Sequence, residues 1–106
     1  MTDILNHIDQ GVMTLTFNRV DKKNSITSAM YATLADAIEQ AEQDASVRVV
    51  VIQGHESIFS AGNDIADFLN NPPATHESPV FRFLRNIAAF PKPLIAAVAG
   101  PAVGIG

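Results

Sequence analysis

Two turns built from small residues are the stretches of this sequence best suited to chemistry. The first, Phe59–Ile65, reads FSAGNDI and lies between an apolar run and a helix-like run, and the second, Gly100–Gly106, reads GPAVGIG. Small residues let the main chain approach a ligand, and amide hydrogens at a helix start carry partial positive charge. Two such turns could aim N–H groups at one developing negative charge, as an oxyanion hole does. Either turn alone is typical of ordinary loops, so the prediction depends on their pairing.

The remaining polar residues offer fewer possibilities. Lys22 and Lys23 form a close basic pair, which fits either a solvated surface turn or a contact to ligand phosphate. The stretch Gly104–Gly106 could open a dinucleotide-binding G-x-G-x-x-G motif, but the match is partial and weak. The chain has no cysteine, and its histidines are too dispersed for a metal site, so we predict no bound metal: His7, His55 and His76.

The turns need a sheet to position them, and the sequence predicts one. Alternating apolar residues predict a hairpin of Ile4–Asp9 and Val12–Asn18. The β-branched run Arg48–Ile52 fits a strand buried on both faces of a parallel sheet. Leu94–Val98 is predicted as the next buried strand.

Helical spacing predicts three helices between these strands. The first begins at Thr27 or Ser28 and runs to about Asp44, the second covers about Asp64–Asn70, and the third covers Val80–Phe90. The proline-rich stretch Asn71–Pro79 is either a connector or a mobile lid. Hairpin, helix, strand, two helices and strand make an α/β arrangement with crossover helices.

The composition excludes several classes of protein. The 106 residues suffice for one small domain, and a 47% hydrophobic content favours a folded chain. A net charge of −4 without a lysine or arginine cluster argues against nucleic-acid binding. We expect a cytoplasmic protein without membrane contact, because no apolar run approaches the ~20 residues that span a bilayer. The chain stops inside a glycine-rich turn, so we expect residues 1–106 to be a single partial domain of a longer protein.

Taken together, the turns and their surroundings resemble the enoyl-CoA hydratase/isomerase (crotonase) superfamily. The resemblance covers nearly the whole chain and matches the N-terminal portion of the family domain. The matching stretches occur in family order: Asn18-Arg19 with Asn24, Val47–Gly54, Phe59–Ile65 and Pro91–Gly104.

The resemblance implies a spiral of ββα units, acyl-CoA thioester substrates and a backbone oxyanion hole for a thioester enolate. By position, the two donors would be the amides of Ala61 and Ile105. Coenzyme A would be part of the substrate, so no separate cofactor is expected, and the full-length protein would form a homotrimer or hexamer. Residues expected to hold the coenzyme A portion are Lys22, Lys23, Ser25, Ser60, Ala61, Gly62, Asn63, Asp64 and Ile65.

The sequence also departs from the family pattern. Val20 replaces a usual proline, Asp21 stands where a basic residue is frequent, Ala99 replaces a common asparagine, and Ile105 replaces a common glycine. The family's catalytic carboxylates would lie beyond Gly106, so we predict that this stretch alone is inactive.

The two turns look closest to the Δ3,Δ2-enoyl-CoA isomerase-like branch. A non-catalytic acyl-CoA-binding member and, more remotely, a dinucleotide-binding domain are the alternatives.

Overall fold

Alternating side chains build the first hairpin of the molecule. In the computed structural model, which describes residues 2–106, β1 (Ile4–Asp9) pairs antiparallel with β2 (Val12–Phe17). Met13, Leu15 and Phe17 of β2 are buried, and the threonines between them are half-buried. The period of two along a strand therefore places the apolar residues on one face, as predicted.

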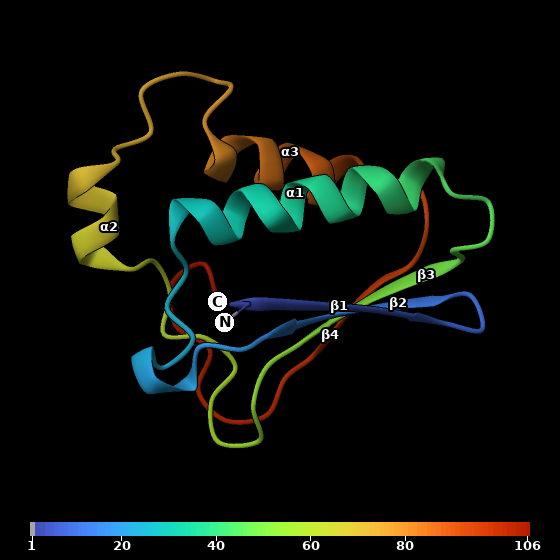
Figure 1. Ribbon diagram of the computed structural model, residues 1–106, viewed down its shortest axis with the longest axis horizontal. Helices are drawn as coiled ribbons and strands as arrows, with labels where there is room; N and C mark the ends of the chain where they lie inside the picture. The colour runs from blue at the N-terminus through green and yellow to red at the C-terminus, as the bar shows by residue number, and fades with distance from the viewer. Residues whose placement is uncertain (1) are drawn as a thin grey trace.

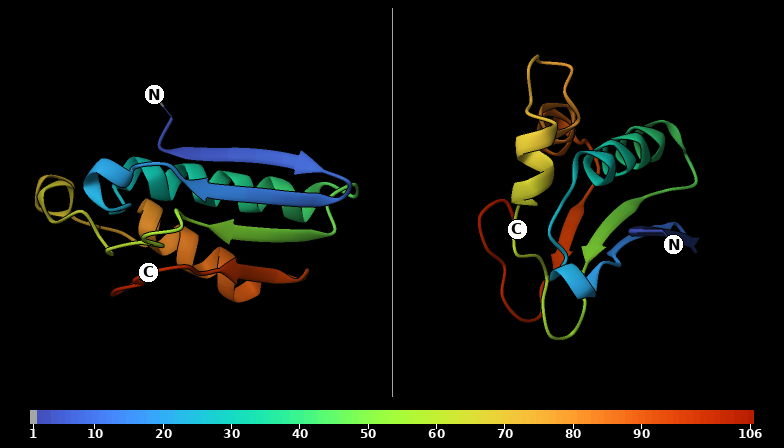
Figure 2. Two further views of the ribbon diagram at one scale, coloured as in Figure 1. Left: turned by 90° about the horizontal axis from the view of Figure 1, so that it is seen from below. Right: turned by 60° about the vertical axis from the view of Figure 1, so that its left-hand side comes forward.

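Two further strands extend the sheet in parallel. β3 (Val49–Gln53) pairs with β2, and β4 (Leu94–Ala97) pairs with β3, so the strand order is β1-β2-β3-β4. The left view of Figure 2 shows the strands side by side in this order. The predicted parallel sheet with crossover helices is confirmed, and β3 begins and ends one residue later than predicted.

The helices pack on one face of this sheet, as Figure 1 shows for α1 (Ser28–Gln43) and α3 (Pro79–Ala89). The hydroxyl of Thr27 accepts the Met30 amide at 3.2 Å, which makes Thr27 the N-cap of α1. The short helix α2 (Ile65–Asn70) stands apart at one end of the molecule, and a 3₁₀ turn, η1 (Val20–Lys22), lies in the loop before α1. Within residues 2–106, no helix has the length and apolar character needed to cross a membrane.

The core lies between the sheet and the two longer helices. Tyr31 of α1 and Phe83 of α3 pack there with ring centroids 5.6 Å apart. The buried apolar residues are Ile4, Met13, Leu15, Phe17, Ile26, Met30, Tyr31, Leu34, Ala35, Ala37, Ile38, Ala41, Val47, Val50, Phe59 and Phe83.

The predictions that β3 is buried on both faces and that β4 is buried were wrong for the described chain. Only Val50 of β3 is fully buried, and Ile95 of β4 is 51% exposed. The reason is that α1 and α3 cover one face of the sheet, while β4 is an edge strand whose other side meets no described element.

One lysine fastens the end of α1 to the start of β4. Nζ of Lys92 donates to the carbonyl oxygens of Ala41 at 2.6 Å, Asp44 at 2.9 Å and Val47 at 2.7 Å. The last carbonyls of a helix have no partner within the helix, so an ammonium group with three donors suits this place. Lys92 thereby connects the loop between α1 and β3 with the loop between α3 and β4. The two small-residue turns follow these two strands.

Candidate functional site

The two small-residue turns lie side by side. Ser60 and Ala102 form a parallel bridge, in which the Ser60 amide donates to Pro101 O at 3.3 Å and the Val103 amide donates to Ser60 O at 3.0 Å. Each turn follows one of two adjacent parallel strands, β3 and β4, so both leave the sheet at the same edge. The structure thus brings together the two stretches on which the sequence prediction depends.

Glycine allows the two main chains to come this close. Gly62 has φ +96°, and a Cβ added there would lie 2.9 Å from Val103 O and 3.9 Å from Gly104 Cα. A side chain at this position would be both strained and in collision with the second turn. Beyond Ala102 the second segment turns, because the Gly106 amide donates to Val103 O at 2.9 Å, and a Cβ added at Gly106 would lie 2.8 Å from Ser60 O.

The hydrogen bonds show which amides of the first turn are occupied. The Ala61 amide donates to Lys23 O at 3.0 Å. Asn63 and Ile26 form a second parallel bridge, whose hydrogen bonds are made by the residues on either side of Asn63. The Ile26 amide donates to Gly62 O at 2.8 Å, and the Asp64 amide donates to Ile26 O at 2.9 Å. In a parallel bridge of this kind, the N–H of the central residue points away from the partner strand.

Within the two turns, the amides without an acceptor among residues 2–106 are those of Asn63, Ile65, Gly100, Ala102, Gly104 and Ile105. Asn63 N–H points to the side opposite Ile26, and its neighbour Gly62 approaches Val103 O of the second turn. The predicted donor Ile105 is thus unoccupied. The predicted donor Ala61 already has an acceptor, Lys23 O.

Buried polar side chains hold the first turn in place. The Ser60 hydroxyl, fully buried, donates to Asn24 O at 2.9 Å and accepts the Gly62 amide at 3.1 Å. Nδ2 of the equally buried Asn24 donates to Phe59 O at 3.2 Å, and its Oδ1 accepts the Arg19 amide at 2.8 Å. Ser60, which was predicted to contact the coenzyme A portion, has its side chain committed to the fold.

An ion pair connects the first turn to the preceding loop. The Arg19 guanidinium donates to Asp64 Oδ2 and to the Ser25 hydroxyl, both at 2.8 Å. Asp64 Oδ1 accepts the Asp67 amide at 2.9 Å and so caps α2. The Asp67 amide and then Arg19 hold the pKa of the Asp64 carboxyl below its ordinary value. Asp64 and Ser25 therefore position the site through their side chains.

The other predicted contacts lie at the surface around this turn. The side chains of Lys22 and Lys23 are exposed beside the turn, and Lys23 supplies the carbonyl that binds Ala61. Ile65 is 75% exposed at the start of α2. The predicted residues thus lie in one region. Ser25, Ser60 and Asp64 support the turn through their side chains, whereas Lys22, Lys23 and Ile65 are exposed.

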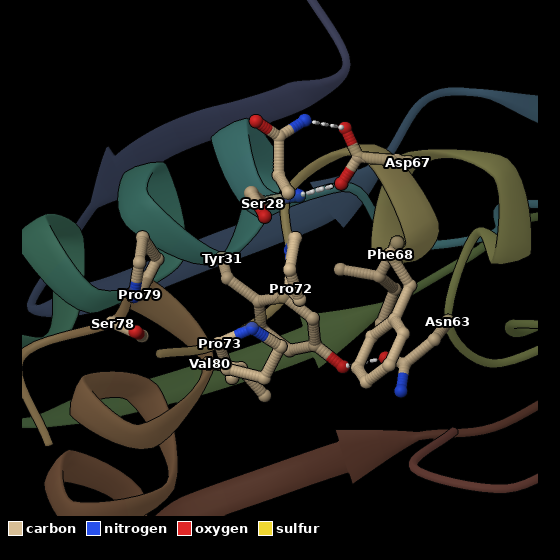
Figure 3. Close-up of a pocket in the computed structure, with 12 residues that line it drawn as sticks. Ser28, Tyr31, Asn63, Asp67, Phe68, Pro72, Pro73, Ser78, Pro79 and Val80 are labelled. Atoms are coloured by element: carbon tan, nitrogen blue, oxygen red, sulfur yellow. Dashed lines mark hydrogen bonds between the residues drawn. The ribbon is translucent and has the colours of Figure 1, made fainter. Parts of the chain in front are cut away.

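Two cavities adjoin the paired turns, one for each turn. An apolar cavity of about 270 Å³ touches Ile105 and Gly106 and is walled by Phe17, Ile26, Ile52, Phe59, Phe83, Ile87, Leu94, Ile95 and Ala96. A second cavity of about 340 Å³ touches Asn63 and is shown in Figure 3. Its other lining residues are Ile26, Ser28, Tyr31, Asp67, Phe68, Asn71, Pro72, Pro73, Ser78, Pro79 and Val80.

Tyr31 is the functional candidate that the sequence prediction missed. Its ring belongs to the core, but its hydroxyl donates to Asn63 Oδ1 in the second cavity. Helical spacing predicts the buried face correctly and carries no signal for a hydroxyl that reaches another segment. Among the described residues, no group of histidine and acidic side chains is arranged to hold a metal ion.

Comparison with known proteins finds similar sequences. The chain is 40% identical over 115 residues to the 1,2-epoxyphenylacetyl-CoA isomerase of Escherichia coli (strain K12), covering 100% of this chain and 43% of that protein. It is 38% identical over 104 residues to enoyl-CoA delta isomerase 2 of Homo sapiens, covering 92% of this chain and 26% of that protein. Other similar proteins are named enoyl-CoA hydratases.

Solved structures show the same similarity. The structure of OdaA from Pseudomonas aeruginosa superposes with a TM-score of 0.95 at 50% identity, covering 100% of this chain and 43% of that one. The chain therefore spans less than half the length of these proteins, and its fold corresponds to the N-terminal part of the crotonase domain. A family model described as enoyl-CoA hydratase/isomerase matches residues 7–106, and the chain belongs to this family.

Proposed function

We propose that this chain forms the thioester-binding part of an acyl-CoA enzyme, and that the amides of Asn63 and Ile105 bind the thioester oxygen. The observation that carries the proposal is that the two turns pack against each other at Ser60 and Ala102, and that the amides of Asn63 and Ile105 have no acceptor among residues 2–106. A carbonyl oxygen that lies between them would accept two hydrogen bonds from rigid main chain.

The chemistry that such a pair assists is enolate formation. When a proton leaves the carbon next to a thioester, negative charge develops on the thioester oxygen. Donors that already point at this oxygen stabilise the charge without reorganising, and this term is often the largest in catalysis. The supports around Ser60 and Asn24 supply the rigidity that this mechanism needs.

The proton itself must be moved by another group. Two carboxylates lie in or directly after the first turn, and both already have partners. Asp64 accepts from the Arg19 guanidinium, and Asp67 accepts from the Ser28 amide. We therefore infer that the acid–base residue lies outside residues 2–106. Lys22 and Lys23 would meet the phosphates of coenzyme A, since both side chains are exposed beside the turn.

We favour an isomerase, which moves a double bond within the acyl chain, over a hydratase. The support is the similarity to proteins named enoyl-CoA delta isomerases. The test is an assay of the intact protein with a 3-enoyl-CoA and with crotonyl-CoA. Turnover of the 3-enoyl-CoA is expected. Faster hydration of crotonyl-CoA would reverse the preference, binding without turnover would favour the non-catalytic alternative, and failure to bind any acyl-CoA would end the proposal.

A further inference from the structure

The cavity beside Asn63 contains a side-chain pair whose geometry is fixed from the core. Tyr31 as a whole residue is 4% exposed and its ring packs on Phe83, so the position of its hydroxyl is set by the packing of α1 against α3. That hydroxyl donates to Asn63 Oδ1, as the dashed line in Figure 3 shows. Burial raises the pKa of Tyr31 to about 12, so the hydroxyl keeps its proton at neutral pH.

This bond leaves the other half of the Asn63 amide available. Nδ2 carries two hydrogens, and neither has an acceptor among residues 2–106. In Figure 3 the nitrogen lies on the side of Asn63 away from the Tyr31 hydroxyl. Because Oδ1 is held by Tyr31, the amide plane is fixed and Nδ2 is a donor with a set direction.

The carboxylate of the same cavity is already satisfied. Asp67 Oδ2 accepts the Ser28 amide at 2.7 Å, and its Oδ1 accepts Nδ2 of Asn71 at 3.2 Å. Much of the remaining wall is apolar, with Phe68, Pro72 and Val80 among its residues. A cavity of about 340 Å³ with apolar walls and one oriented donor has the size and character of a small-molecule site.

Asn63 lines this cavity, and its main-chain amide is one of the two that the proposed function assigns to the thioester oxygen. A thioester oxygen bound at its main-chain N–H would place the first carbons of the acyl group beside its side chain. We propose that the cavity takes the acyl group of a CoA thioester that carries a carbonyl-type oxygen on its fourth or fifth carbon, and that Asn63 Nδ2 donates to this oxygen. Tyr31 acts as the positioning residue. The inference rests on the proposed function, because it uses the same bound thioester.

The test measures a preference between matched ligands by calorimetry on the intact protein. Hexanoyl-CoA is compared with 4-oxohexanoyl-CoA and 5-oxohexanoyl-CoA, whose added oxygen can only accept a hydrogen bond, and free coenzyme A serves as the reference. One new hydrogen bond of ordinary strength predicts that at least one oxo ligand binds about tenfold more tightly than hexanoyl-CoA.

Substitutions then assign the preference to the side-chain pair. Asn63→Leu keeps the main-chain amide and removes the donor, so the preference should vanish. Tyr31→Phe removes only the hydroxyl that fixes the amide and should reduce the preference severalfold, which a merely structural role of the ring would not do. Ser28→Ala, in the same cavity, is the control and should keep the preference.

The outcomes separate this inference from the proposed function. If hexanoyl-CoA binds and neither oxo ligand is preferred, or if Asn63→Leu retains the preference, the inference is wrong and the thioester site stands. An oxo ligand that binds more weakly than hexanoyl-CoA would mean that Asn63 presents its oxygen to the cavity, and would equally overturn it. If neither hexanoyl-CoA nor free coenzyme A binds, the proposed function itself fails.

Discussion

The amide of Asn63 can be tested by replacing a single atom. An amide-to-ester substitution at residue 63 exchanges the N–H for an oxygen and leaves the side chain unchanged. The structure gives this N–H no acceptor among residues 2–106, so the substitution should affect the fold only by weakening Gly62 O as the acceptor of the Ile26 amide. If it binds the developing oxyanion, its removal should lower kcat about 10²–10³-fold, which corresponds to about 2.7–4 kcal/mol of transition-state stabilisation.

The same substitution at residue 61 is the matched control. It removes the hydrogen bond from Ala61 to Lys23 O, which measures 3.0 Å. A neutral bond of this kind contributes about 0.5–1.5 kcal/mol to stability, so the melting temperature should fall. Because this amide faces away from the second turn, kcat should stay within about threefold of the unmodified protein.

The assay is steady-state turnover of the preferred enoyl-CoA by the intact protein, with kcat and KM determined separately and thermal unfolding recorded for each variant. An ester at residue 105 should resemble the ester at residue 63. A large loss of kcat at residue 61 combined with a small loss at residue 63 would return the role to Ala61, as the family resemblance implies. Equal small losses at all three positions would refute a backbone oxyanion hole here.

Three further predictions concern the supports of the site. Lys92→Met leaves three carbonyls without their charged donor and should lower the free energy of unfolding, measured by urea titration, by about 2–3 kcal/mol. The control Lys23→Met, at an exposed side chain, should change this free energy by less than about 0.5 kcal/mol. Gly62→Ala should cost about 1–3 kcal/mol because φ is +96° and Val103 O lies 2.9 Å from the new Cβ; an unchanged urea midpoint would contradict the close approach of the turns. The folded-state pKa of Asp64 is depressed, so its contribution is present above the ordinary carboxyl pKa and is lost as pH falls through the lowered value. Asp64→Asn should therefore unfold at a lower temperature than the parent at pH 6, and the difference should shrink towards pH 2; a constant difference would argue against the ion pair.

The sheet and the helices could be predicted because their signals are local. Alternation along β2 and helical spacing along α1 each reflect one face that must be buried, and both elements begin within a residue of the predicted place. Burial of β4 could not be read in this way. An apolar strand predicts a covering element, but the residues of the strand do not tell which element that is. In the described chain Ile95 is half exposed.

The proximity of the two turns followed from topology, but the state of each amide did not. Parallel neighbouring strands send both turns to one edge of the sheet, so their pairing could be expected from the order of elements. Whether Ala61 or Asn63 has an open N–H depends on Lys23 and Ile26, which belong to another loop. Sequence spacing cannot reveal hydrogen bonds between distant segments. The homotrimer or hexamer, the absence of a cofactor and the cytoplasmic location stay predictions.

The left-handed backbone of Lys23 makes this residue unusually easy to dissect. Its φ of +56° is a conformation that glycine adopts without strain, and its only described tertiary bond is made by the main-chain carbonyl that accepts the Ala61 amide. Lys23→Gly should therefore delete a positive charge next to the predicted phosphates of the ligand and leave the carbonyl in place. This one substitution therefore separates the charge of the Lys23 side chain from the structural role of its main-chain carbonyl.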